Sequence, residues 1–256
     1  MALVGSASKM RDNMTEFTAL VKGRVKIFQI NLAEPLRART YLEQLMGKLE
    51  EVDLVVLAAG TLLTPGPKEI HGVDHHIWVN VVSQAALLRL LEPKLVDDAR
   101  IVALSSVCGH LASTEADDKA TLLRPSLGAY EAYARSKLFL ATYISHLAKT
   151  WMSTTPPPSD AAREHPKIMS VHPGVIGGGL YRNTWIPVRW IIDKVAHLFR
   201  SPELGAALVL HTAIRDDAES GQYYEDSVPT SMGAESSGRN KEIYDAISAS
   251  VDDFLS

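Results

Sequence analysis

Arg100-Ile101-Val102-Ala103-Leu104-Ser105-Ser106 is a short apolar run that ends in two serines. Continuous apolar runs of this length are typical of strands buried on both faces of a parallel sheet. Similar runs occur at Asp53-Leu54-Val55-Val56-Leu57 and at Ile168-Met169-Ser170-Val171, and segments with helical character separate the three. The alternation predicts a doubly wound α/β sheet that is covered by helices on both faces.

Ser106 follows the middle run at the carboxyl end of its strand, where open α/β sheets bind ligands. Tyr133 and Lys137 are four residues apart, so on a helix they share one face. A neighbouring ammonium favours the ionised form of a phenol, whose ordinary pKa is about 10, so such a tyrosine exchanges protons near neutral pH. Tyrosine followed by lysine at this spacing is common, and the pair gains weight only from its context.

The rest of the chain fits one domain. A length of 256 residues with 46% hydrophobic residues is sufficient for a single core, so residues 1–256 are predicted to be one Rossmann-like domain. Further strands are expected at residues 2–5 and 25–30. Further helices are expected at 9–21, about 35–49, about 70–95 and about 202–214.

Composition excludes several classes of protein. A net charge of -4 gives no electrostatic basis for binding nucleic acid. The single cysteine, Cys108, cannot form an internal disulfide, which fits a reducing compartment. No apolar run reaches the roughly 18 residues of a membrane-spanning helix. The sequence therefore predicts a cytoplasmic protein with no nucleic-acid partner, no transmembrane segment and no metal site.

In chain order, Ser106, the Tyr-x-x-Ser-Lys pattern at 133–137 and the apolar helix after it resemble the short-chain dehydrogenase/reductase family. The resemblance implies an NAD(P)-dependent oxidoreductase that transfers hydride between nicotinamide and a carbonyl or alcohol. It implies that Tyr133 is the general acid/base and that Lys137 lowers the pKa of Tyr133 and contacts the nicotinamide ribose. It also implies that Ser106 holds the substrate oxygen.

Other motifs match the family at the expected places. Ala59-Gly60 matches the Ala-Gly half of a turn near the adenosine, and Pro173-Gly174 matches a turn against the nicotinamide. Asn80 matches an asparagine that opens a helix and holds a water of the proton relay, and Asn31 stands where relatives have an aspartate that reads the adenine. The implied cofactor-binding residues are thus Asn31, Ala59, Gly60, Tyr133, Lys137, Pro173 and Gly174. Lys9 and Arg11 favour NADP, with NAD as the alternative.

The later segments resemble the retinol dehydrogenase-like branch of the family, at residues 201–206 and 220–224. The similarity runs over residues 1–226, and residues 227–256 are expected to form a loop and a helix. Residues 181–192 correspond to the substrate lid of relatives and are rich in large apolar side chains. They favour a hydrophobic carbonyl or alcohol substrate, or else packing on the core or on a second subunit of a homo-oligomer. Weak contact with a membrane surface is a third interpretation.

One part of the family pattern is missing. No closely spaced glycines precede Gly60, whereas a dinucleotide fold needs a glycine-rich turn after its first strand. If Met1 lies at the family's second strand, the first βα unit is absent and two interior sheet edges are left unpaired. Gly178 also stands where relatives have a threonine that helps to hold the nicotinamide. Two explanations stay open: a shortened form of a longer enzyme, or a divergent, non-catalytic binding or scaffold protein.

Overall fold

The computed structural model describes residues 2–4, 27–62, 68–112, 121–125, 128–154, 166–176, 199–232 and 239–256. The main sheet has the strand order β3-β6-β7-β8-β9. Its strands are β3 (Val52–Leu57), β6 (Leu95–Leu104), β7 (Lys167–His172), β8 (Tyr223–Glu225) and β9 (Val228–Thr230). The first four are parallel, and β9 is antiparallel to β8. The predicted parallel α/β sheet is confirmed.

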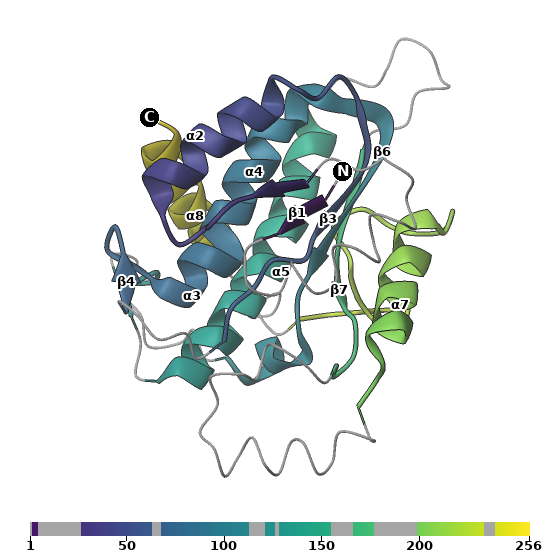
Figure 1. Ribbon diagram of the computed structural model, residues 1–256. Helices are drawn as coiled ribbons and strands as arrows, with labels where there is room; N and C mark the ends of the chain where they lie inside the picture. The colour runs from purple at the N-terminus through teal and green to yellow at the C-terminus, as the bar shows by residue number, and fades with distance from the viewer. Residues whose placement is uncertain are drawn as a thin grey trace.

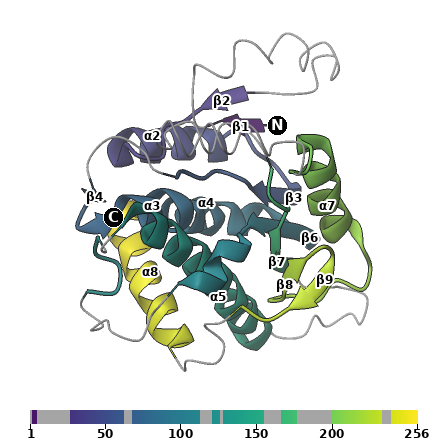
Figure 2. The same ribbon diagram turned by 90° about the horizontal axis from the view of Figure 1, so that it is seen from below.

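Helices cover both faces of this sheet (Figure 1 and Figure 2). One face carries α2 (Pro35–Met46), α4 (Ser83–Leu91), α5 (Ala129–Thr154) and α8 (Asn240–Leu255). The opposite face carries α7 (Pro202–Ile214), whose Val209 and Ala213 pack against Val102, Met169 and Val171. The two hydrophobic clusters on either side of β6 and β7 explain why Ile101–Leu104 of β6 and Ile168–Val171 of β7 carry apolar side chains toward both faces of the sheet.

The segment before α4 differs from the prediction. A helix was expected from about Ile70, but β4 (Glu69–Ile70) and β5 (Val73–Asp74) form a hairpin there, so this prediction is wrong. The turn between them has positive φ angles, 51° at His71 and 75° at Gly72, which a helix cannot contain. The helix begins at α3 (His75–Ile77), because the Asp74 side chain accepts the backbone N–H groups of His76 and Ile77 at 2.7 and 3.3 Å.

The amino-terminal strands form a sheet of their own. Strands β1 (Ala2–Val4) and β2 (Ile27–Gln29) pair in parallel with each other. Within the described residues, β3 pairs only with β6, so its other edge has no strand neighbour. This agrees with the predicted gap between β1 and β3. The helix expected at residues 9–21 lies outside the described residues.

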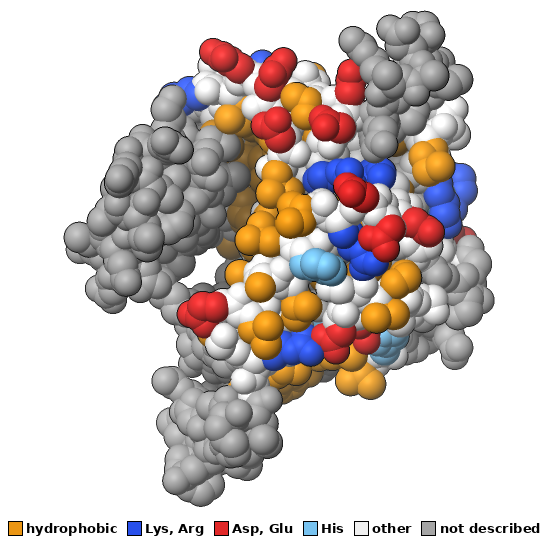
Figure 3. Space-filling model, turned by 90° about the vertical axis from the view of Figure 1, so that its right-hand side faces the viewer, with side chains coloured by type: hydrophobic (Ala, Val, Ile, Leu, Met, Phe, Trp, Pro, Cys, Tyr) orange, Lys and Arg blue, Asp and Glu red, His pale blue; other side chains and the backbone are white. Residues whose placement is uncertain are grey.

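The α7 side of the sheet is only partly covered at β3. Leu54 and Val56 on β3 are each 41% exposed, although they are large and apolar. Figure 3 shows this side of the molecule, where hydrophobic side chains are exposed between charged ones. None of the helices in the described ranges combines the length and the apolar character needed to cross a bilayer.

Candidate active site

The ends of β6 and β7 bring two predicted segments to the same edge of the sheet, because the strands are parallel. Ser106 follows β6 and caps a short turn, Val107–Leu111, where its Oγ accepts the Cys108 N–H at 3.3 Å. Its neighbour Ser105 donates its hydroxyl to the backbone carbonyl of Lys137 at 2.7 Å. The strand that carries Ser106 is thereby joined directly to helix α5.

Tyr133 and Lys137 are both buried on α5. The Lys137 Nζ donates to the Leu104 carbonyl at 2.7 Å and lies 5.7 Å from the centroid of the Tyr133 ring. Burial lowers the pKa of Lys137 to about 8, and the nearby Cys108 thiol opposes this shift only in part. The lysine is therefore mainly cationic at neutral pH and titrates just above it.

Asn80 lies in a π-helical turn, Trp78–Val82, between α3 and α4. In this turn the Ser83 N–H bonds to the Trp78 carbonyl, so the α-helical ladder is interrupted. The Asn80 carbonyl accepts from the Gln84 side chain at 2.7 Å. The helix is therefore locally irregular at this asparagine, while its role in a proton relay stays a prediction.

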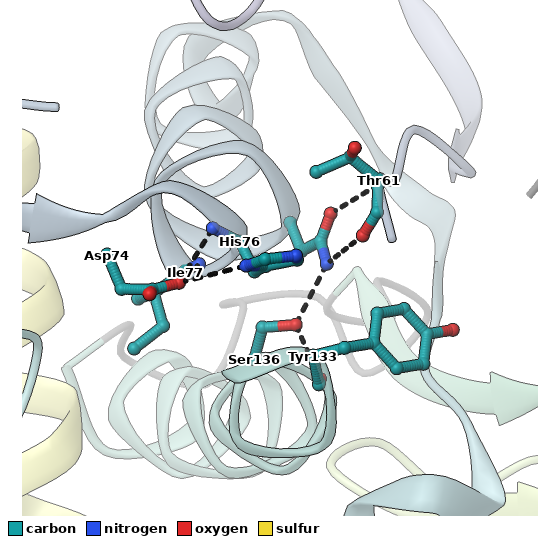
Figure 4. A network of polar contacts seen from close by, with 7 residues as sticks. Thr61, Asp74, His76, Ile77, Tyr133 and Ser136 are labelled. Atoms are coloured by element: carbon teal, nitrogen blue, oxygen red, sulfur yellow. Dashed lines mark hydrogen bonds and ion pairs between the residues drawn. The ribbon is translucent and has the colours of Figure 1, made fainter. Parts of the chain in front are cut away.

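The Asn80 side chain is completely buried and connects two elements. Figure 4 shows Thr61 on one side of this network and Ser136 with Tyr133 on the other. The Asn80 Nδ2 donates to the Ser136 Oγ at 2.8 Å, and the Ser136 hydroxyl donates to the Tyr133 carbonyl at 2.7 Å. Its Oδ1 accepts the Thr61 N–H at 2.7 Å, and its Nδ2 also donates to the Thr61 carbonyl at 3.1 Å. Asn80 therefore joins the loop after β3 to the helix that carries Tyr133.

Ala59 and Gly60 lie on this same loop. The Ala59 carbonyl accepts from the Gln84 Nε2 at 2.7 Å. A Cβ atom built on Gly60 would lie 3.5 Å from both the Asn80 Oδ1 and the Lys137 Nζ. Gly60 is thus the point at which the asparagine and the lysine come together, and its surface is exposed.

Pro173 and Gly174 form the turn after β7. Gly174 has a φ of +92°, and a Cβ on it would lie 2.3 Å from the Arg200 Cδ, so the arginine side chain packs directly on this glycine. The His172 Nδ1 and the Arg200 Nη1 are buried and have no hydrogen-bond partner in the described parts of the chain. Burial lowers the pKa of His172, so its ring is neutral near pH 7.

Asn31 is not brought into this cluster. It follows β2 in the separate two-stranded sheet, and among the described residues its amide makes local bonds, from the Ala33 N–H at 3.2 Å and to the Glu34 Oε1 at 2.6 Å. Its role at the adenine stays a prediction. Lys9, Arg11, Gly178 and residues 181–192 lie outside the described residues.

Sequence reasoning missed three residues of this network. Ser136 is part of the Tyr-x-x-Ser-Lys pattern, so a signal for it was present. Gln84 is four residues after Asn80, a spacing that places both on one helix face. Thr61 takes part through its backbone alone, and a side-chain motif cannot reveal such a contact.

Comparison with known proteins gives a consistent result. No family model matches the chain. Mouse retinol dehydrogenase 12 is 26% identical over 242 residues, which cover 93% of this chain and 70% of the relative. Mouse retinol dehydrogenase 11 is 28% identical over 212 residues, which cover 80% of this chain and 63% of the relative. The chain thus spans about two thirds of the length of these curated relatives.

Solved structures share the fold. A short-chain dehydrogenase from Salmonella enterica superposes with a TM-score of 0.61 at 18% identity and covers 88% of this chain and 84% of its own. A complex of Pseudomonas aeruginosa RhlG with NADP gives a TM-score of 0.60 at 20% identity, covering 87% of this chain and 82% of its own.

The curated relatives and the shared fold together support a short-chain dehydrogenase/reductase enzyme of the retinol dehydrogenase-like branch. This agrees with the resemblance seen in the sequence.

Proposed function

We propose that this chain is an NAD(P)-dependent oxidoreductase that interconverts a hydrophobic alcohol and its carbonyl. The observation that supports this most strongly is the convergence of Asn80, Lys137 and Gly60 beside the buried Tyr133. Lys137 also bonds to both residues that precede Ser106, through the Leu104 carbonyl and the Ser105 hydroxyl.

Each residue has a chemical role in this proposal. Tyr133 gives or takes the proton of the substrate hydroxyl, and the Lys137 ammonium stabilises the phenolate electrostatically. The Ser106 Oγ is an acceptor in its bond with the Cys108 N–H, so its own O–H proton is available to donate to the substrate oxygen. Asn80 fixes the loop at Gly60 against α5, which sets the distance between Lys137 and the bound reactants.

The residues at this edge fit a nicotinamide dinucleotide. The exposed Gly60 leaves its Cβ position free next to Lys137, and the absence of a side chain at Gly174 lets the Arg200 side chain lie against the second turn. The buried His172 Nδ1 and Arg200 Nη1 lack hydrogen-bond partners among the described residues. Both atoms could therefore form hydrogen bonds with a ligand at this edge of the sheet. When bound, the dinucleotide supplies or accepts the hydride. Lys137, Gly60 and Gly174 would hold its nicotinamide end.

The choice of dinucleotide is a finer proposal. A structural neighbour is a complex with NADP, which supports a nicotinamide dinucleotide in general. We favour NADP because Lys9 and Arg11 follow the first strand and residues 5–11 include no acidic residue to bind a ribose hydroxyl. A cytoplasmic location and a homo-oligomer stay predictions.

The substrate class rests on two features. The relatives are named retinol dehydrogenases, and residues 181–192 are rich in large apolar side chains. A hydrophobic alcohol or aldehyde fits both.

Titration of the purified 256-residue chain with NADPH and then NADH tests the proposal directly. Energy transfer from the four tryptophans to the reduced nicotinamide reports binding. We expect saturable binding of NADPH, with weaker binding of NADH, and oxidation of NADPH on addition of a hydrophobic aldehyde such as retinal. Failure of a well-folded sample to bind either dinucleotide would contradict the proposal and favour a non-catalytic role.

A further inference from the structure

We propose that Glu225 and Asp226, at the tip of the β8–β9 hairpin, are positioning residues for this site. Glu225 fixes the turn that Ser106 caps, and Asp226 fixes the Pro173–Gly174 turn through Arg200. The proposal rests on the proposed oxidoreductase function, but the contacts themselves do not depend on a bound molecule.

The hairpin presents the two carboxylates in different directions. Asp226 and Ser227 form a two-residue turn with φ angles of 51° and 63°, and Glu225 pairs with Val228 across it. Glu225 is also the direct neighbour of His172 on the parallel strand β7. The tip of the hairpin therefore lies at the same edge of the sheet as the ends of β6 and β7.

The first contact joins the hairpin to the Ser106 turn. His110 lies in that turn, Val107–Leu111, and its Nε2 is 2.8 Å from the Glu225 Oε1. The Tyr223 hydroxyl donates to the same oxygen at 2.8 Å, and its ring makes an edge contact with the His110 ring. Burial alone would raise the pKa of Glu225, but the bonds from Tyr223 and His110 outweigh it and lower the pKa. Glu225 is therefore a carboxylate at neutral pH.

The second contact joins the hairpin to the Pro173–Gly174 turn. The Asp226 Oδ1 pairs with the Arg200 Nη2. Arg200 also donates its backbone N–H to the Val175 carbonyl at 2.9 Å, and its side chain packs on Gly174. Asp226 therefore determines where the guanidinium lies over the turn that we assign to the nicotinamide. Because Asp226 is 62% exposed, its effect is expected to be modest.

Ser227 provides an internal control. Its hydroxyl bonds to the His211 Nδ1 at 3.0 Å, and its carbonyl accepts from Arg215. These bonds join Ser227 to α7 and to the residue that follows α7. Among the described residues they reach neither the Ser106 turn nor the Pro173–Gly174 turn. Three consecutive residues thus bind three different segments. Replacing each one in turn should loosen only its own segment.

The test compares Glu225→Gln, Asp226→Asn and Ser227→Ala by hydrogen–deuterium exchange of the protein without dinucleotide. Asparagine tolerates the positive φ at position 226, so this change removes the charge and keeps the turn. We expect exchange to become about three- to tenfold faster at residues 107–112 in Glu225→Gln. In Asp226→Asn we expect the increase at residues 173–176 and 199–201. Ser227→Ala should alter neither segment.

Binding and kinetics then separate positioning from general stability. Asp226→Asn should raise the Kd for NADPH about threefold and change kcat less than twofold, and Asp226→Glu should restore the affinity. Glu225→Gln should raise the KM for the aldehyde about threefold and leave the Kd for NADPH unchanged. The proposal is overturned if both variants loosen both segments equally, or if neither segment changes. Since the exchange measurement needs no dinucleotide, failure of the oxidoreductase assignment would not be mistaken for failure of this proposal.

Discussion

Strands β6 and β3 are neighbours, but they differ in what surrounds them. Strand β6 is hydrogen-bonded on both sides, to β3 and to β7, whereas β3 is bonded on one side within the described residues. Val102 on β6 and Val56 on β3 are register partners, yet Val102 is fully buried and Val56 is 41% exposed. Two valines that are neighbours in the sheet thus differ in exposure, one in the core and one partly in solvent.

The same contrast separates the residues that we propose for proton transfer from the residue predicted at the adenine. The residues proposed for proton transfer lie on the β6 and α5 side, where Asn80, Ser105 and Lys137 connect distant elements. On the other side, Asn31 bonds to residues within three positions of itself in the described parts of the chain. The residues proposed for proton transfer are therefore held by tertiary contacts, while Asn31, the residue predicted at the adenine, is held by local ones.

The largest effect is expected from Tyr133→Phe, which tests the β6 and α5 half alone. Removing the hydroxyl removes the general acid/base, so turnover with an aldehyde and NADPH should fall about 10²- to 10⁴-fold. The ring stays buried, so the far-ultraviolet circular dichroism spectrum should not change. Turnover within tenfold of the parent protein would rule out this role for Tyr133.

A matched pair of core variants measures the comparison itself. Val102→Ala should lower the free energy of unfolding by about 2 to 3 kcal/mol, because it leaves a cavity between β6 and α7. Val56→Ala should lower it by less than about 1 kcal/mol, because that side chain is already partly solvated. Urea denaturation of both variants gives the two values. Equal losses would mean that β3 is covered in solution as well as β6.

Lys137→Met should separate activity from stability. A buried ammonium favours its neutral form, so its pKa of about 8 in the folded state is below the ordinary value of about 10.4 in the unfolded chain. The unfolded chain then binds more protons between these values, and stability rises as pH increases through that range. At pH 7 the variant should be about 1 to 2 kcal/mol more stable than the parent protein.

The difference in free energy of unfolding between Lys137→Met and the parent protein should disappear as the pH approaches about 10. Turnover of the variant should be lost at every pH. Urea denaturation at pH 7, 8.5 and 10 measures this difference in free energy of unfolding. A difference that stays constant with pH would show that the pKa of Lys137 is the same in the folded and the unfolded chain.

The smallest effect is expected from Ser136→Ala. It removes the acceptor for the Asn80 Nδ2 and the donor to the Tyr133 carbonyl, so turnover should fall about threefold to tenfold. The control is Ser153→Ala on the exposed end of the same helix, where the hydroxyl bonds to the Thr150 carbonyl and to no other residue among those described. If both variants behave like the parent protein, the link from Asn80 to Tyr133 is dispensable.

Much of the fold was predictable from the sequence, because it follows from local patterns. Helix α7 begins and ends where it was expected, at Pro202 and Ile214, and β3, β6 and β7 include the apolar runs that predicted them. The predicted start of the helix before Asn80 was wrong, because the periodicity of apolar residues does not reveal the positive φ angles at His71 and Gly72. The candidate site residues other than Asn31 lie at the carboxyl edge that the parallel sheet creates.

The sequence by itself determined the three apolar strands of the parallel sheet, the spacing of Tyr133 and Lys137, and the resemblance to the short-chain dehydrogenase/reductase family. These depend on side-chain periodicity and on motifs within a few residues of each other. Only the tertiary structure decided that Asn80 binds Ser136, that one edge of β3 has no strand neighbour among the described residues, and that Glu225 contacts His110 and Asp226 contacts Arg200. The physical reason is that hydrogen bonds between residues far apart in the sequence depend on how the helices pack on the sheet. A local sequence pattern does not specify how close two such residues come in space.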